Sequence, residues 1–186
     1  MHDRKADVSS IPFMTATELS ALMRDGTLSA REVLAAHIQR IESINPIINA
    51  LVALDLDRAM DQASGLDKHW NRNTPKGPLY GLPTAHKDIL PTKGIRTTRG
   101  SKIFADDVPG TDHIVVERMK NAGAITIGKT NVPELGLGSH TFNDVYGLTR
   151  NPYDTSKSAG GSSGGAAAAL AARLIPIADG SDTGGS

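Results

Sequence analysis

Residues 164–178, GGAAAALAARLIPIA, join an alanine-rich segment of high helix propensity to a short apolar run. The same order occurs upstream, where a helical segment over residues 112–121 precedes the apolar residues 124–127. Glycines and turn residues around such runs are typical of buried strands. Helices that alternate with buried strands predict an α/β fold, in which helices cover a mixed central β-sheet.

The first 77 residues are predicted to form a helical segment, an N-terminal appendage to the core of residues 78–186. Two helix starts carry the capping-box pattern, in which Ser or Thr is followed three residues later by Glu. The two pairs are Thr15 with Glu18, and Ser29 with Glu32.

The ends of these helices are marked by residues that terminate helices. Gly26 is predicted to end the first helix. Asn45-Pro46 is predicted to end the second, because a residue before proline avoids the helical conformation. A third helix is predicted over residues 55–68, and residues 1–14 are predicted to be a loose leader.

Composition excludes several classes of function. The chain has 186 residues, a formal net charge of zero and no cysteine. This balance gives no electrostatic reason to expect nucleic acid or a membrane as partner, and disulfides and cysteine-ligated zinc are excluded. No apolar run is long enough to span a bilayer, so we expect a cytoplasmic protein. The six histidines lack a metal-binding spacing, and neither a metal nor a cofactor is expected.

Residues 123–130, GAITIGKT, match the phosphate-loop pattern G-x-x-x-x-G-K-T. A phosphate cradle needs a flexible loop after a strand, and a helix that begins at the Lys-Thr pair. Here the middle residues are apolar and β-prone, and Asn131-Val132-Pro133 follows at once. We therefore interpret the segment as a buried strand that ends at Gly128.

Residues 161–165, GSSGG, fit the nucleophile-elbow pattern G-x-S-x-G. An elbow needs a strand before it and a histidine after it. Residues 154–158 are polar and loop-like, and no histidine follows His140. A serine–histidine hydrolase therefore stays as an alternative only.

Two glycine–serine clusters and one lysine suggest acyl transfer without histidine. The clusters are residues 160–165 and residues 180–186, and the second ends on Ser186. Glycine beside serine lets backbone N–H groups approach a reacting carbonyl, because no Cβ blocks the approach. Lys87 lies in a partly apolar segment, and burial of a lysine lowers its pKa.

From about residue 78 onward the chain resembles the amidase signature family of serine hydrolases. Several motifs occur in the order typical of that family and span more than half of the chain. They are GLP (81–83) with HKD (86–88), GKTNVPE (128–134), TRNPYD (149–154), the cluster at 160–165, and GSDTGGS (180–186).

The resemblance implies a catalytic triad of Lys87, Ser162 and Ser186. Ser186 corresponds to the nucleophile and Lys87 to the base, while Ser162 bridges them and follows a cis peptide bond. To accept a proton, Lys87 must be largely neutral, so its pKa must lie well below the ordinary value of about 10.4.

The resemblance also implies four substrate-binding residues. Ser163 supports the site through hydrogen bonds. Backbone N–H groups of Thr183, Gly184 and Gly185, with that of the nucleophile, form an oxyanion hole. Asp182 is expected to fix this loop.

The activity that the resemblance implies is hydrolysis of a small-molecule amide to an acid and an amine or ammonia. The alternative is the amidase component of a tRNA-dependent amidotransferase, which supplies ammonia to a partner subunit. An Arg-Val-Pro-like run usually precedes the serine cluster in that component. This chain has Lys157-Ser158-Ala159 there, and Ala178-Asp179 before its last motif, which favours a stand-alone enzyme. A non-catalytic relative is disfavoured because all three triad residues are present.

The family pattern continues beyond the nucleophile. We therefore expect this chain to be an incomplete core that is inactive and poorly folded by itself. The N-terminal helices are expected either to cap the core or to form the face of a homodimer.

Overall fold

Four strands form the central sheet of the computed structural model, which describes residues 8–73 and 76–186. In spatial order they are β1 (Leu51–Val52), β3 (Ile125–Thr130), β2 (Pro83–Lys87) and β8 (Ile177–Ala178). β2 is parallel to both of its neighbours, and β1 is antiparallel to β3. The sheet is therefore mixed, and the predicted α/β class is confirmed.

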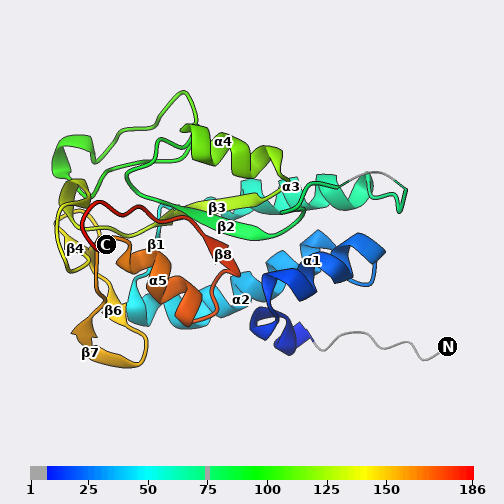
Figure 1. The fold of residues 1–186 in the computed structure, drawn as a ribbon, viewed down its shortest axis with the longest axis horizontal. Helices are drawn as coiled ribbons and strands as arrows, with labels where there is room; N and C mark the ends of the chain where they lie inside the picture. The colour runs from blue at the N-terminus through cyan, green and yellow to red at the C-terminus, as the bar shows by residue number, and fades with distance from the viewer. Residues whose placement is uncertain (1–7, 74–75) are drawn as a thin grey trace.

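Helices lie on opposite sides of this sheet (Figure 1). In that view α4 (Ile114–Asn121) lies above the strands, while α2 (Ala30–Ile48) and α5 (Gly164–Ala171) lie below them. α3 (Leu56–Lys68) packs against both α2 and β3, close to its predicted bounds. Within the described ranges, no helix has the length and apolar character needed to cross a membrane.

Both predicted capping boxes are present. At the start of α1 (Ala16–Asp25), Thr15 Oγ1 accepts from the N–H of Glu18 at 3.2 Å, and the N–H of Thr15 donates to Glu18 Oε2 at 2.7 Å. Ser29 and Glu32 repeat this exchange before α2, at 3.1 and 2.9 Å. These bonds satisfy N–H groups that a helix start leaves unpaired. Gly26 ends α1 as predicted, with a φ of 83°.

The prediction that α2 ends at Asn45-Pro46 is wrong. The helix continues through Pro46, where it lacks one N–H in its last turn. Its end is set by Asn49, which has a φ of 51° and whose N–H donates to the carbonyl of Asn45 at 2.7 Å. Asn45 Oδ1 also accepts from the N–H groups of Ala50 and Leu51, at 3.0 and 2.9 Å. The Asn45 side chain thereby ties the helix end to β1.

The prediction of a loose leader is also wrong for those of its residues that the structure describes. A 3-10 helix, η1 (Val8–Phe13), precedes α1, and Ile11 on it is fully buried. η1 packs against α2, so burial of apolar surface holds it in place. Residues 1–7 of the predicted leader lie outside the described residues.

The two predicted apolar strands differ from expectation in length. β3 does not end at Gly128 but continues to Thr130, and each of its residues is buried. In the second run only residues 177–178 pair, with β2. Leu174 and Ile175 are buried ahead of the strand, and Pro176 between them and β8 has no N–H for a ladder.

Two hairpins and two short 3-10 helices complete the described elements. β4 (Phe142–Asn143) pairs with β5 (Gly147–Leu148), and β6 (Arg150–Asn151) pairs with β7 (Asp154–Ser158). Residues 154–158, predicted as loop, therefore form a strand of a separate two-stranded sheet whose side chains are largely exposed. The 3-10 helices are η2 (Lys102–Phe104) and η3 (Glu134–Gly136).

The N-terminal helices and the sheet share one hydrophobic core. Leu19 of α1, Leu34 of α2, Ile127 of β3 and Leu174 before β8 are all fully buried members of one cluster. β1 lies in the N-terminal segment of the chain but pairs with β3. The strand end that carries Lys87 is therefore supported by elements from both parts of the sequence.

Candidate active site

Three serine hydroxyls surround the side-chain nitrogen of Lys87, the last residue of β2. Nζ lies 2.8 Å from Ser162 Oγ, 2.9 Å from Ser163 Oγ and 2.8 Å from Ser181 Oγ. Only 1% of Lys87 is exposed. The residue pairs with Thr130 of β3, so the sheet fixes its main chain while its side chain reaches the hydroxyl groups.

Ser162 and Ser163 lie immediately before α5, and the peptide bond between Gly161 and Ser162 is cis. The two glycines that follow have no room for a side chain. A Cβ on Gly164 would lie 2.1 Å from Thr141 Oγ1, and one on Gly165 would lie 2.3 Å from the main-chain nitrogen of Asn131. Close packing against neighbouring segments therefore requires glycine at both positions.

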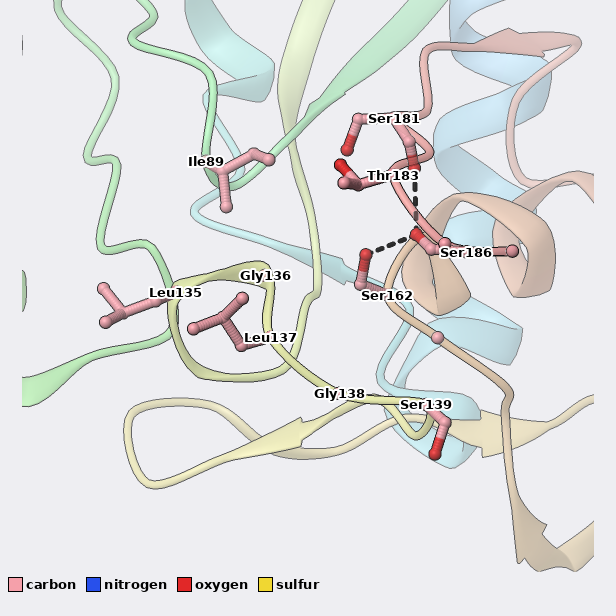
Figure 2. A pocket seen from close by; sticks show the side chains of 13 residues that line it. Ile89, Leu135, Gly136, Leu137, Gly138, Ser139, Ser162, Ser181, Thr183 and Ser186 are labelled. Atoms are coloured by element: carbon pink, nitrogen blue, oxygen red, sulfur yellow. Dashed lines mark hydrogen bonds between the residues drawn. The ribbon is translucent and has the colours of Figure 1, made fainter.

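Ser186 lies in the segment that follows β8, and its hydroxyl contacts the hydroxyl of Ser162. Their Oγ atoms lie 2.5 Å apart, and Ser186 Oγ also donates to the carbonyl of Ser181 at 2.9 Å (Figure 2). Lys87, Ser162 and Ser186 thus form one continuous line of hydrogen bonds. The structure brings together the three residues that the resemblance assigned to a triad.

Asp182 closes the turn before Ser186. Its Oδ1 accepts from the N–H groups of Gly185 and Ser186, at 2.6 and 2.9 Å. These two bonds hold the pKa of the Asp182 carboxyl below its ordinary value. Both N–H groups are among those predicted to serve an oxyanion hole, and in this arrangement each already has an acceptor.

The hydroxyls of Ser162 and Ser186 face a cavity of about 420 Å³ (Figure 2). This volume is in the range of small-molecule sites. One wall comes from residues 135–139, and another from residues 181 and 183–186. Ile89, Leu135 and Leu137 contribute apolar side chains, so the serines border a mostly uncharged space.

Burial lowers the pKa of Lys87 below the ordinary value of a lysine, while the charges of Asp179 and Asp182 act in the opposite direction. The net direction is the one that the resemblance requires. A lysine with a lowered pKa spends more time as the neutral amine, the form that can accept a proton.

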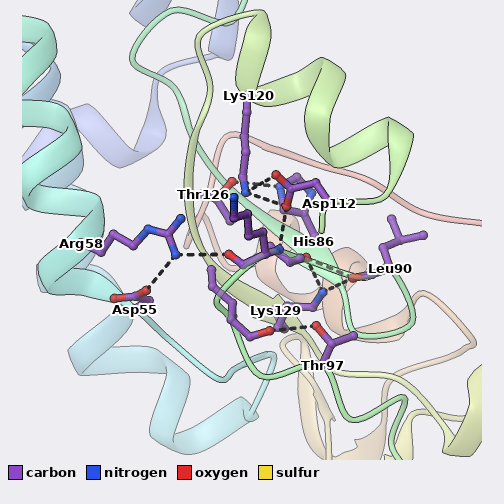
Figure 3. Close-up of polar contacts among 12 residues, drawn as sticks. Asp55, Arg58, His86, Leu90, Thr97, Asp112, Lys120, Thr126 and Lys129 are labelled. Atoms are coloured by element: carbon purple, nitrogen blue, oxygen red, sulfur yellow. Dashed lines mark hydrogen bonds and ion pairs between the residues drawn. The ribbon is translucent and has the colours of Figure 1, made fainter. Parts of the chain in front are cut away.

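Lys129, the lysine of the phosphate-loop match, lies inside β3. Its Nζ donates to Thr92 Oγ1 at 2.7 Å and to the carbonyl of Leu90 (Figure 3). Burial lowers the pKa of Lys129 to about 8, although the nearby Asp88 charge raises it. The interpretation of this segment as a buried strand is confirmed for Ile125–Thr130, although the strand does not end at Gly128, and the lysine is bonded within the protein.

The nucleophile-elbow alternative finds no support in the geometry. Within the described ranges, the hydroxyl hydrogen bonds of Ser162 and Ser186 join lysine, serine and backbone groups, and none involves a histidine. His140 instead lies 2.9 Å from Ser158 Oγ, on the second hairpin. Among the residues that the structure describes, no group of three or more His, Cys, Asp or Glu could hold a metal ion.

A family model described as Amidase matches residues 32–186. This chain belongs to the amidase family. Among its relatives, a glutamyl-tRNA(Gln) amidotransferase subunit of Salinispora tropica is 44% identical over 179 residues, which cover 96% of this chain and 36% of that protein. An acylamidase of Rhodococcus erythropolis is 42% identical over 177 residues, covering 95% and 37%.

Solved amidase structures show the same fold. Fatty acid amide hydrolase superposes with a TM-score of 0.91 at 29% identity, covering 96% of this chain and 32% of that one. The amidase chain described here therefore spans about a third of the length of the relatives it matches. The predicted family is confirmed.

Two polar residues of the amidase site were missed in the sequence. Ser181 contributes the third hydroxyl at Lys87, and the carboxylate of Asp179 accepts from the backbone N–H of Lys87 at 2.7 Å. Asp179 also bonds His86, which precedes Lys87 in the HKD motif. A carboxylate directly after a predicted buried strand is the signal that could have pointed to Asp179.

Proposed function

We propose that the protein hydrolyses a carboxylic acid amide to an acid and an amine or ammonia through a serine acyl-enzyme. The observation that carries the proposal is the line of hydrogen bonds from Lys87 through Ser162 to Ser186, at 2.8 and 2.5 Å. The line ends at a cavity that fits a small molecule. Membership of the amidase family supports the reaction class.

Lys87 acts as the general base in this proposal. A neutral amine has two N–H donors and one lone pair, which match the three hydroxyls around Nζ. The two N–H groups donate to Ser163 and Ser181, and the lone pair accepts from Ser162. Ser162 Oγ can then accept a proton from Ser186 as it donates its own, once the single O–H of Ser186 turns from the Ser181 carbonyl to Ser162 Oγ.

The reaction begins when Ser186 Oγ attacks the carbonyl carbon of the amide. The Ser186 proton passes to Ser162 as the Ser162 proton passes to Lys87 Nζ, while the carbonyl electron pair moves to oxygen. Collapse of this intermediate breaks the C–N bond, and the proton returns through Ser162 to the leaving nitrogen. Water then attacks the ester by the same relay, which releases the acid and restores Ser186.

The oxyanion is proposed to form beside residues 183–186. Backbone N–H groups of Thr183, Gly184, Gly185 and Ser186 are its donors in this proposal. In the free site, Asp182 accepts from Gly185 and Ser186. A developing oxyanion would therefore compete with Asp182 for these two donors.

A second candidate is the amidase component of a tRNA-dependent amidotransferase that supplies ammonia to a partner subunit. The 44% identity to one component of such an enzyme favours it. The similarity to an acylamidase, at 42%, favours a stand-alone enzyme instead. Hydrolysis of a simple acyl amide by the purified protein without a partner would support the stand-alone enzyme. Glutamine hydrolysis that depends on a partner subunit would support the second candidate.

The experiment that tests the acyl-enzyme is labelling of the intact protein with a fluorophosphonate, which reacts with activated serines. We expect labelling at Ser186, found by peptide mass spectrometry. Ser186→Ala is expected to abolish it, and Lys87→Ala to slow it by about 100-fold or more. Ser64→Ala is the matched control, because that hydroxyl lies on α3 and bonds the carbonyl of Met60 at 2.7 Å, away from the relay.

Two outcomes would contradict this assignment. Labelling that survives Ser186→Ala would move the nucleophile to Ser162 or Ser163. A wild-type protein that is not labelled at any serine would contradict the activated nucleophile itself.

A further inference from the structure

A buried carboxylate joins the two strand ends that border the site. Asp179, directly after β8, accepts from the backbone N–H of Lys87 through Oδ1 at 2.7 Å, and its Oδ2 lies 2.5 Å from His86 Nδ1. The His86 side chain is fully buried, and that of Asp179 is 7% exposed. Hydrogen bonds to a charged acceptor are stronger than those between neutral groups, so this contact holds β2 and the end of β8 firmly together.

The contact between Asp179 and Lys87 lies just beyond the last main-chain pair of β2 and β8. β8 pairs with β2 only at Thr84 with Ile177 and at Ala85 with Ala178. At Lys87 the N–H that faces β8 donates to a side-chain carboxylate rather than to a main-chain carbonyl. Asp179 therefore extends the link between the strands to the residue whose side chain enters the site.

The loop that carries Ser186 continues directly from this carboxylate. Two residues after Asp179, Ser181 Oγ lies 2.8 Å from Lys87 Nζ, and the Ser181 carbonyl accepts from Ser186 Oγ at 2.9 Å. The backbone of Lys87 and the start of the loop are thus both attached to Asp179. The distance between Lys87 and Ser186, which the proposed proton relay must cover, therefore depends on this attachment.

We propose that Asp179, held by His86, is a positioning residue that sets where the Lys87 amine stands relative to the loop that bears Ser186. The inference rests on the function proposed above for Lys87 and Ser186. A displacement of about 1 Å between reacting groups can slow an enzyme about 100-fold. Loss of the carboxylate is therefore expected to slow acylation, even though Asp179 touches no substrate atom in the proposed mechanism.

The charge of Asp179 gives this position a second effect. The Asp179 carboxylate contacts Lys87 and His86 directly and acts on Lys129 at longer range. Asp182 is the other carboxylate that acts on Lys87. Both carboxylates raise the pKa of Lys87 against the effect of burial. Removing the Asp179 charge would lower that pKa further, so Lys87 would become neutral at a lower pH.

Asp112, near the other edge of the His86 ring, provides a matched control. His86 Nε2 lies 3.0 Å from Thr126 Oγ1, and the neighbouring Asp112 is paired with Lys120 at 2.8 Å (Figure 3). His86 is close enough to act electrostatically on Asp112, but the Asp112 carboxylate accepts its hydrogen bonds from Lys120 and from the N–H of Lys93. Asp112→Asn therefore removes a carboxylate charge from the same neighbourhood without touching the relay.

The test is the rate of fluorophosphonate labelling at Ser186 in the intact protein, measured from pH 5 to pH 10, about the range in which a lowered lysine pKa falls. Four proteins are compared: wild type, Asp179→Asn, Asp179→Ala and Asp112→Asn. Asparagine can still accept from the N–H of Lys87, so we expect a plateau rate within about threefold of wild type and an acidic limb displaced to lower pH. For Asp179→Ala we expect a plateau about 10- to 100-fold lower. Asp112→Asn is expected to follow the wild-type profile.

Thermal melts of each protein show whether it is folded. If Asp179→Ala does not fold, His86→Leu tests the positioning role instead, because leucine removes the hydrogen bond that holds Asp179 and should slow labelling. Wild-type profiles in both Asp179 variants would overturn the inference. So would an equal shift in Asp112→Asn, because the effect would then come from general charge. If the wild type is not labelled at Ser186, the proposed function fails instead, which is a distinct result.

Discussion

Lys129 Nζ lies 2.7 Å from Thr92 Oγ1, and both residues are fully buried. The Leu90 carbonyl is a second acceptor for the ammonium group, and the charge of Asp88 lies near enough to raise the pKa of Lys129. Burial nevertheless outweighs these contacts and lowers that pKa to about 8. The charged form of Lys129 is therefore less favourable in the folded protein than in the unfolded chain.

From this lysine we predict that stability rises between about pH 8 and pH 10.5. In that window the unfolded chain binds a proton at Lys129 more often than the folded protein, so the free energy of unfolding increases with pH. The contribution is about 3 kcal/mol. Denaturant unfolding of the intact protein across this range, compared with Lys129→Met, measures it. Parallel pH dependences in the two proteins would contradict the prediction.

From His37 we predict that the free energy of unfolding falls in acid. Burial lowers the pKa of His37 to about 4, although hydrogen bonds to the backbone of Leu174, 3.1 Å from Nδ1, and of Arg173 act in the opposite direction. Between pH 6.5 and pH 4 the unfolded chain binds more protons at this residue, so stability falls as the pH falls, by about 3 kcal/mol in total. His37→Leu should lack this component. An acid unfolding midpoint that is the same in both proteins would show that another group controls it.

Two substitutions of His86 separate the effect of its hydrogen bond from the effect of its side-chain volume. Asparagine can place an N–H donor near the position of Nδ1, so His86→Asn should keep the bond to Asp179 and label within about threefold of wild type. Leucine has no donor, so His86→Leu should lose about 1–3 kcal/mol of stability and label more slowly. Labelling rates and denaturant midpoints are measured on both variants. Equal behaviour of the two would mean that only the volume of the side chain matters.

Glycines at two helical positions predict opposite effects of alanine. A Cβ on Gly165 would lie 2.3 Å from the main-chain nitrogen of Asn131, so Gly165→Ala should cost about 1–3 kcal/mol or more. On α3, a Cβ on Gly65 would meet nothing within 4 Å, and Gly65→Ala should stabilise the protein by about 0.5–1 kcal/mol. Denaturant midpoints test both. A Gly165→Ala protein as stable as wild type would show that α5 can shift.

Local signals in the sequence predicted the parts of the fold that depend on near neighbours. The capping boxes at Thr15 and Ser29 involve residues three positions apart, and both are present. The end of α2 was mispredicted because Asn45 bonds main-chain groups beyond the helix and so lets Pro46 remain inside it. That bond depends on where the chain goes after the helix, which no local pattern states.

β2 was not predicted as a strand because its sequence, Pro-Thr-Ala-His-Lys, has neither an apolar run nor an alternation. All five of its residues are nevertheless buried, since β3 and β8 flank the strand and polar partners receive its side chains. Lys87 and the serines were found through motifs of the family. The bond between His86 and Asp179 was not, because 93 residues separate the pair and only the sheet brings them together.

The two glycines at the start of α5 also bear on how this scaffold can change in evolution. With Gly164 against Thr141 and Gly165 against Asn131, the wall that holds Ser162 leaves no space for new side chains. The facing wall is different, since Leu135 and Leu137 there are exposed at 48% and 77%. Lineages that acquire new substrates are therefore expected to accumulate their replacements around residues 135–139, while residues 162–165 stay invariant.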